Sequence, residues 1–203
     1  MRIAAHSGRV QALLPLQCGY LVSASGGSDG SVKIWDEASA LEVAHLKCEH
    51  GHVVSLALFS GAAFVSGSDD GRLQIWDANR RTEIKRFAGH QERITALAIL
   101  PDGRLASASI DGTIRRWHIQ CDTETDRLGE HLGWLNALAV LPRNRLASGS
   151  VDKTIRVCDL KTATEICRFE IDAPVSALVA IPGSQMPVAG DAFGNLHWLN
   201  IVE

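Results

Sequence analysis

The sequence lacks the features that usually mark membrane, secreted and nucleic-acid-binding proteins. Its 20 Lys and Arg residues are outnumbered by 23 Asp and Glu residues, which gives a formal net charge of -3. This balance leaves no basic surplus to attract nucleic acid. No segment approaches the roughly eighteen uninterrupted apolar residues of a membrane span, and residues 1–6 lack the apolar stretch of a secretion signal. We therefore expect a cytoplasmic protein without nucleic-acid or membrane partners.

Motifs for the common enzyme chemistries are also missing. The chain has no Gly-rich phosphate loop ending in Gly-Lys-Ser or Gly-Lys-Thr, no serine nucleophile elbow and no His-Glu-x-x-His. Its five cysteines are an odd number without repeat-related spacing, so we expect reduced, mostly structural thiols rather than a disulfide framework. The sequence therefore predicts no enzyme activity and no cofactor.

What the chain does contain is one segment copied several times. Trp-Asp dipeptides end two copies, at Trp35-Asp36 and Trp76-Asp77, and the same 41-residue spacing leads on to Trp117, Cys158 and Leu199. A period of roughly 40 to 45 residues, with four strands in each unit, is typical of β-propeller blades. At 203 residues the chain is long enough for one sizeable core and too short for two comfortable domains.

Apolar residues within each copy recur with the period of a strand. In the third copy, residues 93–100 alternate until Pro101-Asp102-Gly103 stops them, and residues 104–109 follow as a hairpin partner. Between the second and third strands lie Asp29-Gly30, Asp70-Gly71 and Asp111-Gly112, where a tight turn needs a positive φ that glycine adopts without strain. The fourth strands are more polar, as fits an exposed outer strand.

These repeated elements make the chain resemble the WD-repeat β-propellers over nearly its whole length. The resemblance implies an all-β fold of five blades with four antiparallel strands each, in one domain covering residues 1–203. The repeats lie approximately at residues 6–46, 47–87, 88–128, 129–169 and 170–203. We expect residues 1–5 to supply the fourth strand of the last blade. Two arrangements remain open, a closed five-blade ring and a part of a larger propeller.

The resemblance also implies a buried hydrogen-bonded tetrad in each of the first four repeats. It joins a His before the first strand, a Ser on the second, an Asp in the next turn and a Trp on the third. The sets are His6, Ser23, Asp29 and Trp35; His50, Ser66, Asp70 and Trp76; His90, Ser107, Asp111 and Trp117; and His131, Ser148 and Asp152, with Cys158 in place of Trp. A catalytic triad occurs once in a fold, whereas this set is repeated at one period, so we interpret it as structural.

Two segments have the residue types of a zinc site, His45 to His52 and His118 to Cys121. His and Cys two or three residues apart can present nitrogen and sulfur to zinc. However, His50 already belongs to a tetrad, and the other ligands fall at different positions of the blade. We therefore expect no metal site.

A partner-binding surface is implied at the rim of the central channel, which is a common contact site in WD-repeat propellers. The matching positions before the first strands and before the tetrad Asp residues are Arg9, Val53, Arg93 and Trp134, and Ser28, Asp69, Ile110 and Val151. Trp134 attracts most interest because Trp is over-represented in binding hot spots, although it could equally pack against a neighbouring loop. The function we expect is that of a non-catalytic protein-interaction platform or sensor module in signalling.

The fifth repeat departs from the pattern. Its Trp198 comes one residue early, so its side chain should point to the opposite face of the strand. This ending is similar to the last blade of propellers at the C-termini of bacterial multidomain signalling ATPases. The alternative function is therefore a regulatory C-terminal fragment or subunit of such an enzyme. An open array would also expose unpaired edges, which favour self-association or completion by another chain.

Overall fold

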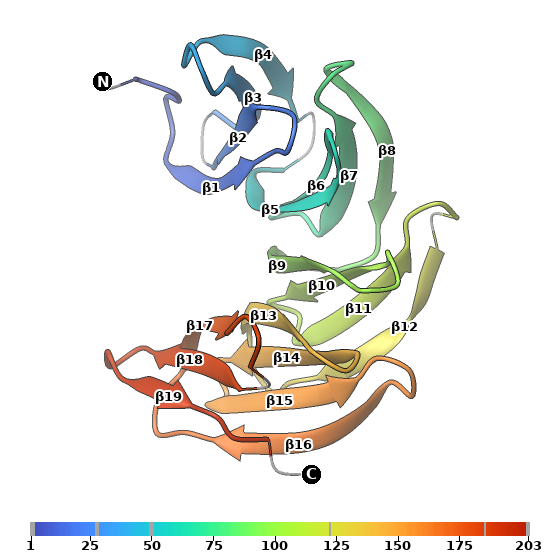
Figure 1. Cartoon of the computed structure of the whole chain (residues 1–203), viewed down its shortest axis with the longest axis vertical. Coiled ribbons are helices and arrows are strands. Elements are labelled where there is room, and N and C mark those ends of the chain that lie inside the picture. Colours follow the sequence, from blue (N-terminus) through green and yellow to red (C-terminus); the bar gives the residue numbers. More distant parts are fainter. Residues whose placement is uncertain (1–2, 27–28, 49–50, 122, 185, 202–203) are drawn as a thin grey trace. The chain divides into compact units, whose positions relative to one another are not determined.

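A computed structural model describes residues 3–26, 29–48, 51–121, 123–184 and 186–201 of the chain. In these residues the regular elements are nineteen β-strands in five sheets (Figure 1). In the same residues, no helix is long and apolar enough to cross a membrane. The all-β prediction with four-stranded antiparallel blades is confirmed, since four sheets have four strands and the fifth has three.

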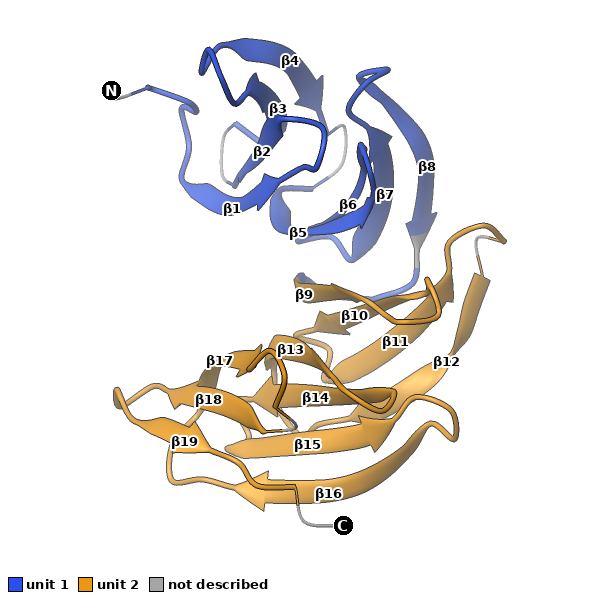
Figure 2. Cartoon of the chain, in the orientation of Figure 1, with its two compact units in different colours: residues 1–94 blue, residues 95–203 orange. Residues whose placement is uncertain are grey.

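The strands divide between two compact units, residues 1–94 and 95–203 (Figure 2). Unit 1 contains β1 (Val10–Pro15), β2 (Tyr20–Ser25), β3 (Ser31–Asp36) and β4 (Glu42–Lys47) in one sheet, and β5 (Val53–Ser60), β6 (Ala63–Ser68), β7 (Arg72–Asp77) and β8 (Thr82–Ala88) in another. The prediction of a single propeller domain over residues 1–203 stays a prediction.

Unit 2 contains three sheets, and its first strand begins at Ile94, the last residue of unit 1. The sheets are β9 (Ile94–Ile99), β10 (Leu105–Ser109), β11 (Thr113–His118) and β12 (Thr123–Glu130); β13 (Leu135–Leu141), β14 (Arg145–Ser150), β15 (Thr154–Asp159) and β16 (Thr164–Glu170); and β17 (Val175–Ala180), β18 (Pro187–Asp191) and β19 (Leu196–Trp198).

Each sheet is an antiparallel meander in which strands pair in chain order. The turns between second and third strands have the expected chemistry, with φ of 80° at Gly71 and 82° at Gly112. In the fourth repeat Lys153 occupies this place and still adopts a φ of 67°. The register shifts just before the third-strand Trp or its replacement, as between Ile75 and Trp76 and between Val157 and Cys158. These bulges place the residue at the Trp position in the same way in the four four-stranded sheets.

The cores lie between consecutive sheets of each unit. In unit 1, Val32 and Leu46 of the first sheet belong to one apolar cluster with Phe64 and Trp76 of the second. The Phe64 and Trp76 rings stack with centroids 6.4 Å apart. Burying an apolar side chain of this size stabilises the fold by about 1.5–3 kcal/mol. Each sheet is therefore held chiefly by the face that it shares with the next sheet.

The fifth sheet shows how the last repeat differs from the others. Trp198 pairs with Val188, and the following residue Leu199 is buried where the other repeats have Trp or Cys. Neighbouring residues of a strand point to opposite faces of the sheet. The Trp198 side chain therefore points away from the face of Leu199, as the sequence predicts. Residues 3–5 belong to none of the described strands. Closure of the last blade by residues 1–5 therefore stays a prediction.

Candidate functional site

The first repeat brings together all four residues of its predicted tetrad. The Trp35 indole Nε1 donates to the Ser23 hydroxyl over 2.8 Å, and Ser23 lies 2.7 Å from His6 Nε2. The other ring nitrogen, Nδ1, lies 3.0 Å from an Asp29 carboxylate oxygen. Because a carboxylate only accepts, Nδ1 carries the proton and Nε2 accepts from Ser23. The result is one chain of hydrogen bonds from Trp35 to Asp29.

The lowered pKa of Asp29 agrees with its role as a hydrogen-bond acceptor from His6. Burial acts to raise the pKa of the carboxyl, but hydrogen bonds from the Ser31 hydroxyl, the Ser7 backbone N–H and His6 outweigh it and hold the pKa below its ordinary value. Asp29 therefore stays ionised and anchors the residues that precede the first strand.

The fourth repeat forms the same network without the indole. His131 Nδ1 lies 3.0 Å from Asp152, and His131 Nε2 lies 2.8 Å from the Ser148 hydroxyl. Asp152 also accepts from the Thr154 hydroxyl over 2.7 Å. Burial lowers the pKa of His131 despite the opposing effect of the Asp152 carboxylate, so the ring is neutral near pH 7. Cys158 stands where the other repeats have Trp, and its thiol faces the Leu146 carbonyl oxygen at 3.6 Å.

The second and third repeats show parts of their predicted tetrads. Trp76 donates to Ser66 over 2.8 Å, and Trp117 donates to Ser107 over 2.7 Å. Asp111 accepts from the Thr113 hydroxyl, while Asp70 contacts the Ser68 hydroxyl and the Arg72 guanidinium. His50 lies outside the described residues, and His90 is buried in unit 1.

The fifth repeat replaces the tetrad with a network centred on Asp191. Its carboxylate accepts from His197 Nε2 over 2.9 Å and from the Asn195 side chain over 3.0 Å. Backbone N–H groups of Phe193 and Asn195 complete the set. The hydrogen bonds from His197 and Asn195 hold the pKa of Asp191 well below its usual range. This network fixes the β18–β19 turn, on which Phe193 is exposed.

A cavity of about 300 Å³ lies in unit 2 beside Cys158, which stands where the other repeats have Trp. Its inner wall is made by Ile114 and Leu128 of the sheet β9–β12 and by Ser148 and Cys158 of the sheet β13–β16. Burial raises the pKa of the Cys158 thiol to about 11, so the thiol is protonated and a poor nucleophile near neutral pH.

The predicted rim residues differ widely in exposure. Arg9 and Trp134 are exposed, and Arg93, Asp69, Ile110 and Val151 are half-buried. The Asp69 carboxylate accepts from the His52 backbone N–H over 2.6 Å. Ser28 lies outside the described residues.

Val53 is a correction to the predicted partner surface. It is fully buried because it belongs to the core cluster with Phe64 and Trp76. A residue with no exposed surface cannot touch a partner, so Val53 leaves the set of binding candidates.

The loop before β13 carries two strongly exposed apolar residues. Leu132 is 95% exposed and Trp134 is 59% exposed. The Leu132 backbone N–H donates to Asp152 over 3.0 Å, and the Trp134 carbonyl accepts from the Val151 N–H over 2.9 Å. Sequence reasoning named Trp134 but missed Leu132. The signal was present, because an apolar residue directly follows the tetrad His131.

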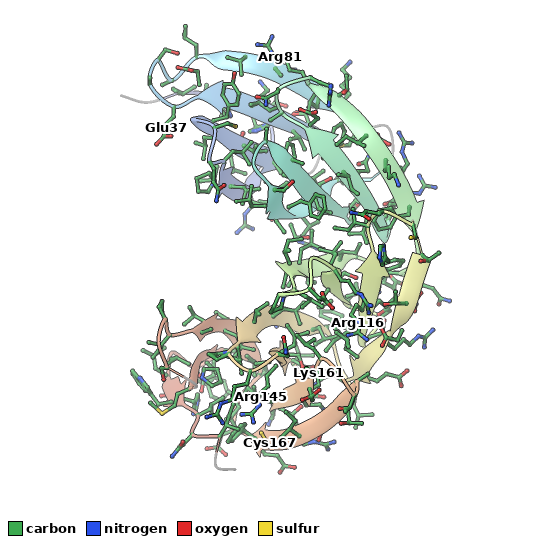
Figure 3. All side chains as sticks on the ribbon, turned by 45° about the vertical axis from the view of Figure 1, so that its right-hand side comes forward. Glu37, Arg81, Arg116, Arg145, Lys161 and Cys167 are labelled. Carbon is green, nitrogen blue, oxygen red and sulfur yellow. The ribbon has the colours of Figure 1, made fainter. Side chains whose placement is uncertain are left out.

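An ion pair between buried Arg116 and half-buried Asp126 was also not predicted. Arg116 stands on β11 where neighbouring repeats have Ile34, Ile75 or Val157 (Figure 3). Its guanidinium forms two hydrogen bonds with the Asp126 carboxylate on β12 and donates to the Leu160 carbonyl. Arg116 thus links two sheets of unit 2 by polar contacts.

In the described ranges, no group of three or more His, Cys, Asp and Glu side chains is placed to hold a metal ion. Glu49 and His50 of the first candidate zinc segment lie outside these ranges. Cys121 of the second segment is exposed and free.

Comparison with known families identifies the repeats. The model of the WD domain, G-beta repeat (WD40) matches residues 1–36, 43–77, 81–118 and 123–159. These segments cover more than half of the chain, which therefore belongs to the WD40 repeat family. WD40 repeats typically form modules that bind protein partners. A comparison with curated proteins gives no match.

Two solved structures share the fold. The computationally designed protein Ika8 is 30% identical, with a TM-score of 0.83 over 97% of this chain and 60% of that chain. A chain of the mitotic checkpoint complex is 23% identical, with a TM-score of 0.83 over 92% of this chain and 59% of that chain. The present chain therefore spans about 60% of the length of these two structures.

Proposed function

We propose that this protein is a non-catalytic interaction platform that binds a protein partner through the loop of residues 131–134, here called the Leu132–Trp134 loop. The observation that carries the proposal is the exposure of Leu132 and Trp134 on a backbone fixed by hydrogen bonds. Trp is among the residues most enriched in binding hot spots, and Leu132 extends the exposed apolar surface beside Trp134. A protein partner is expected because WD40 repeats typically form protein-binding modules.

The rigidity of the loop supports binding rather than disordered exposure. Asp152 holds the Leu132 N–H and the His131 ring, while Val151 pairs with the Trp134 carbonyl. A Cβ atom added at Gly133 would lie 2.8 Å from a Val151 methyl carbon, so the loop packs closely on the next turn. A preorganised loop loses little conformational entropy when a partner binds, which favours affinity.

A non-catalytic role agrees with the hydrogen bonds within the tetrads. The Ser23 and Ser148 hydroxyls belong to buried residues, and each is already bonded to a histidine ring. Ser23 also accepts from Trp35, so both hydrogen-bonding roles of its hydroxyl are used. These groups satisfy one another in the protein interior, where an unpaired polar group costs about 1–3 kcal/mol.

The test uses a photoreactive p-benzoylphenylalanine at position 132, with the same residue at position 193 as the matched control on another exposed loop. We expect a discrete crosslinked protein from position 132 only. Excess wild-type chain should abolish that product, whereas excess Trp134→Ser chain should leave it. Equal products from both positions, or equal competition by both chains, would contradict the proposal.

We propose a second copy of this chain as a further partner, bound by the apolar faces of the first and last sheets. Leu13 is 62% exposed on the sheet β1–β4, although its counterpart Leu56 packs against the preceding sheet. Trp198 is 61% exposed on the sheet β17–β19, although its counterpart Val157 is fully buried. On each of these two faces, the exposed residue stands at a position that is packed inside another repeat of the chain. We therefore propose that a blade of a second copy covers the face.

Native mass spectrometry over a concentration series tests this second contact. We expect species larger than one chain that grow with concentration, and we expect Leu13→Glu or Trp198→Glu to remove them. Leu41→Glu is the matched control, since Leu41 is equally exposed but lies in the turn between β3 and β4. A single-chain mass at every concentration would refute self-association and leave the Leu132–Trp134 loop proposal untouched.

A second candidate function is regulation within a signalling ATPase or effector enzyme. The departure of the fifth repeat favours it, because the Asp191 network replaces the tetrad there. An antibody against the chain, applied to extracts of the native cells, distinguishes the two functions. A product carrying catalytic domains, or one of the length of this chain that precipitates together with a catalytic protein, would support the regulatory function. A product of the length of this chain without a catalytic protein would refute it.

A further inference from the structure

We propose that the cavity beside Cys158 binds a small indole-like molecule, meaning a flat bicyclic aromatic ring with one N–H group. The cavity has a volume of about 300 Å³ and lies wholly within unit 2. His131 lines this ligand site and also belongs to the Leu132–Trp134 loop, but the proposal does not rest on the proposed function.

The position of the cavity is that of a missing tryptophan side chain. In unit 1, Trp76 belongs to one apolar cluster with Val32 and Leu46 of the preceding sheet. The same three positions recur 82 residues later as Cys158, Ile114 and Leu128. Ile114, Leu128 and Cys158 all line the cavity. The cavity therefore occupies the place that an indole ring fills in the second repeat.

The hydrogen-bond acceptor for an indole N–H is also retained. In the first three repeats the serine of the second strand accepts from Trp Nε1 over 2.7–2.8 Å. In the fourth repeat the Ser148 hydroxyl lies 2.8 Å from His131 Nε2, which has to accept because Nδ1 faces Asp152. The Ser148 proton is thus directed to His131, and its oxygen lone pairs can accept an N–H from a ligand.

Size and charge define the ligand class further. An apolar cavity of about 150 Å³ is enough to hold benzene, so about 300 Å³ leaves room for a bicyclic ring. Charged side chains at the cavity are paired with each other, with Arg156 at 3.2 Å from Glu165 and Arg127 at 3.4 Å from Glu130. Since these charges balance, an uncharged ring fits better than a strong acid or base.

The primary experiment titrates indole into the purified full chain by isothermal calorimetry. We expect one site with a dissociation constant on the order of 0.1–1 mM. Cys158→Trp should abolish this binding, because its own side chain would fill the cavity. Cys158→Ala, which leaves the cavity open, should retain it. Binding by Cys158→Trp equal to the wild type, or no heat from the wild type up to the solubility limit of indole, would overturn the proposal.

N-methylindole tests the role of Ser148. It has nearly the shape of indole but no N–H, so we expect binding roughly three- to ten-fold weaker from the loss of one hydrogen bond. Equal affinity for the two compounds would overturn recognition through an N–H group.

A thiol-protection experiment gives a readout that needs no variant to fold. Alkylation of the wild type at alkaline pH, where part of the Cys158 thiol is ionised, is followed by mass spectrometry, with exposed Cys18 and Cys121 as internal controls. Indole at ten times its dissociation constant should slow the alkylation of Cys158 about ten-fold, because only the free chain reacts. The rates at Cys18 and Cys121 should stay unchanged. An equal change at all three cysteines, or no change at Cys158, would overturn the proposal.

Discussion

At the scale of single residues, the tetrads act by keeping buried polar groups paired. In the first repeat, Ser23 accepts from Trp35 and contacts His6, so both hydrogen-bonding roles of the hydroxyl are used. In the fourth repeat Cys158 contributes only a weak contact to a backbone carbonyl. The network then depends more heavily on Asp152, which also holds the loop proposed to bind a partner.

Replacement of Asp152 tests this dependence. Asp152→Ala leaves His131, Thr154 and the Leu132 N–H without their acceptor. We expect the free energy of unfolding to fall by about 2–4 kcal/mol, as measured by urea denaturation. Asp102→Ala, at an exposed turn, is the control and should change it by about 0.5 kcal/mol or less. Equal stability of the two variants would refute the role given to Asp152.

The stability of the fourth repeat should also depend on pH through His131. Burial holds the folded-state pKa of His131 below its ordinary value of about 6.5, so the unfolded chain binds the proton more readily. The contribution of His131 is therefore complete above about pH 6.5 and is lost as the pH falls toward the folded-state pKa. Asp152, whose pKa is also lowered, adds a loss only at more acidic pH, as the carboxyl becomes protonated.

The measurement is the free energy of unfolding in urea between pH 7.5 and pH 5. We expect it to fall on acidification, with His131 contributing at most about 1.4 kcal/mol per pH unit. His131→Gln should show a shallower slope, because the titrating group is gone. The same slope in both proteins would show that His131 titrates alike in the folded and unfolded chains.

At the scale of elements, the sequence predicted the strands and turns well because their signals are local. Alternation and Asp-Gly pairs predicted β9, β10 and the turn at Gly112 directly. The left-handed conformation of Lys153 was not predicted, because Lys has no intrinsic preference for it and the repeat imposes it. The cavity was also not predicted, since its shape depends on residues of two sheets that are far apart in the sequence.

The contact between neighbouring sheets can be tested at one glycine of β14. A Cβ atom added at Gly149 would lie 2.4 Å from a Val175 methyl carbon, so the sheets would have to separate. We expect Gly149→Ala to lower the free energy of unfolding by about 1–3 kcal/mol. Gly129→Ala is the matched control, because its new methyl would meet Ile114 only at 3.9 Å. A loss of stability in the control alone would contradict the packing described here.

At the scale of the whole molecule, the WD40 repeats share one blade architecture but expose different residues. The repeat period predicted the blade architecture, since the strands follow from position within a repeat. It did not predict which rim residues are accessible. Val53 lies in the core, whereas Leu132, which the period does not single out, is the most exposed large apolar residue in the described part of the chain. Accessibility depends on packing between repeats, which a single repeat does not encode.

The most direct test of the central claim measures how tightly the partner crosslinked at position 132 binds to purified variants. Surface plasmon resonance would compare the wild type, the double variant Leu132→Ser/Trp134→Ser and the matched control Phe193→Ser. We predict at least a ten-fold loss of affinity in the double variant and less than a two-fold change in the control, because removal of a binding hot spot costs about 2 kcal/mol or more. Equal affinity of all three proteins would contradict the account.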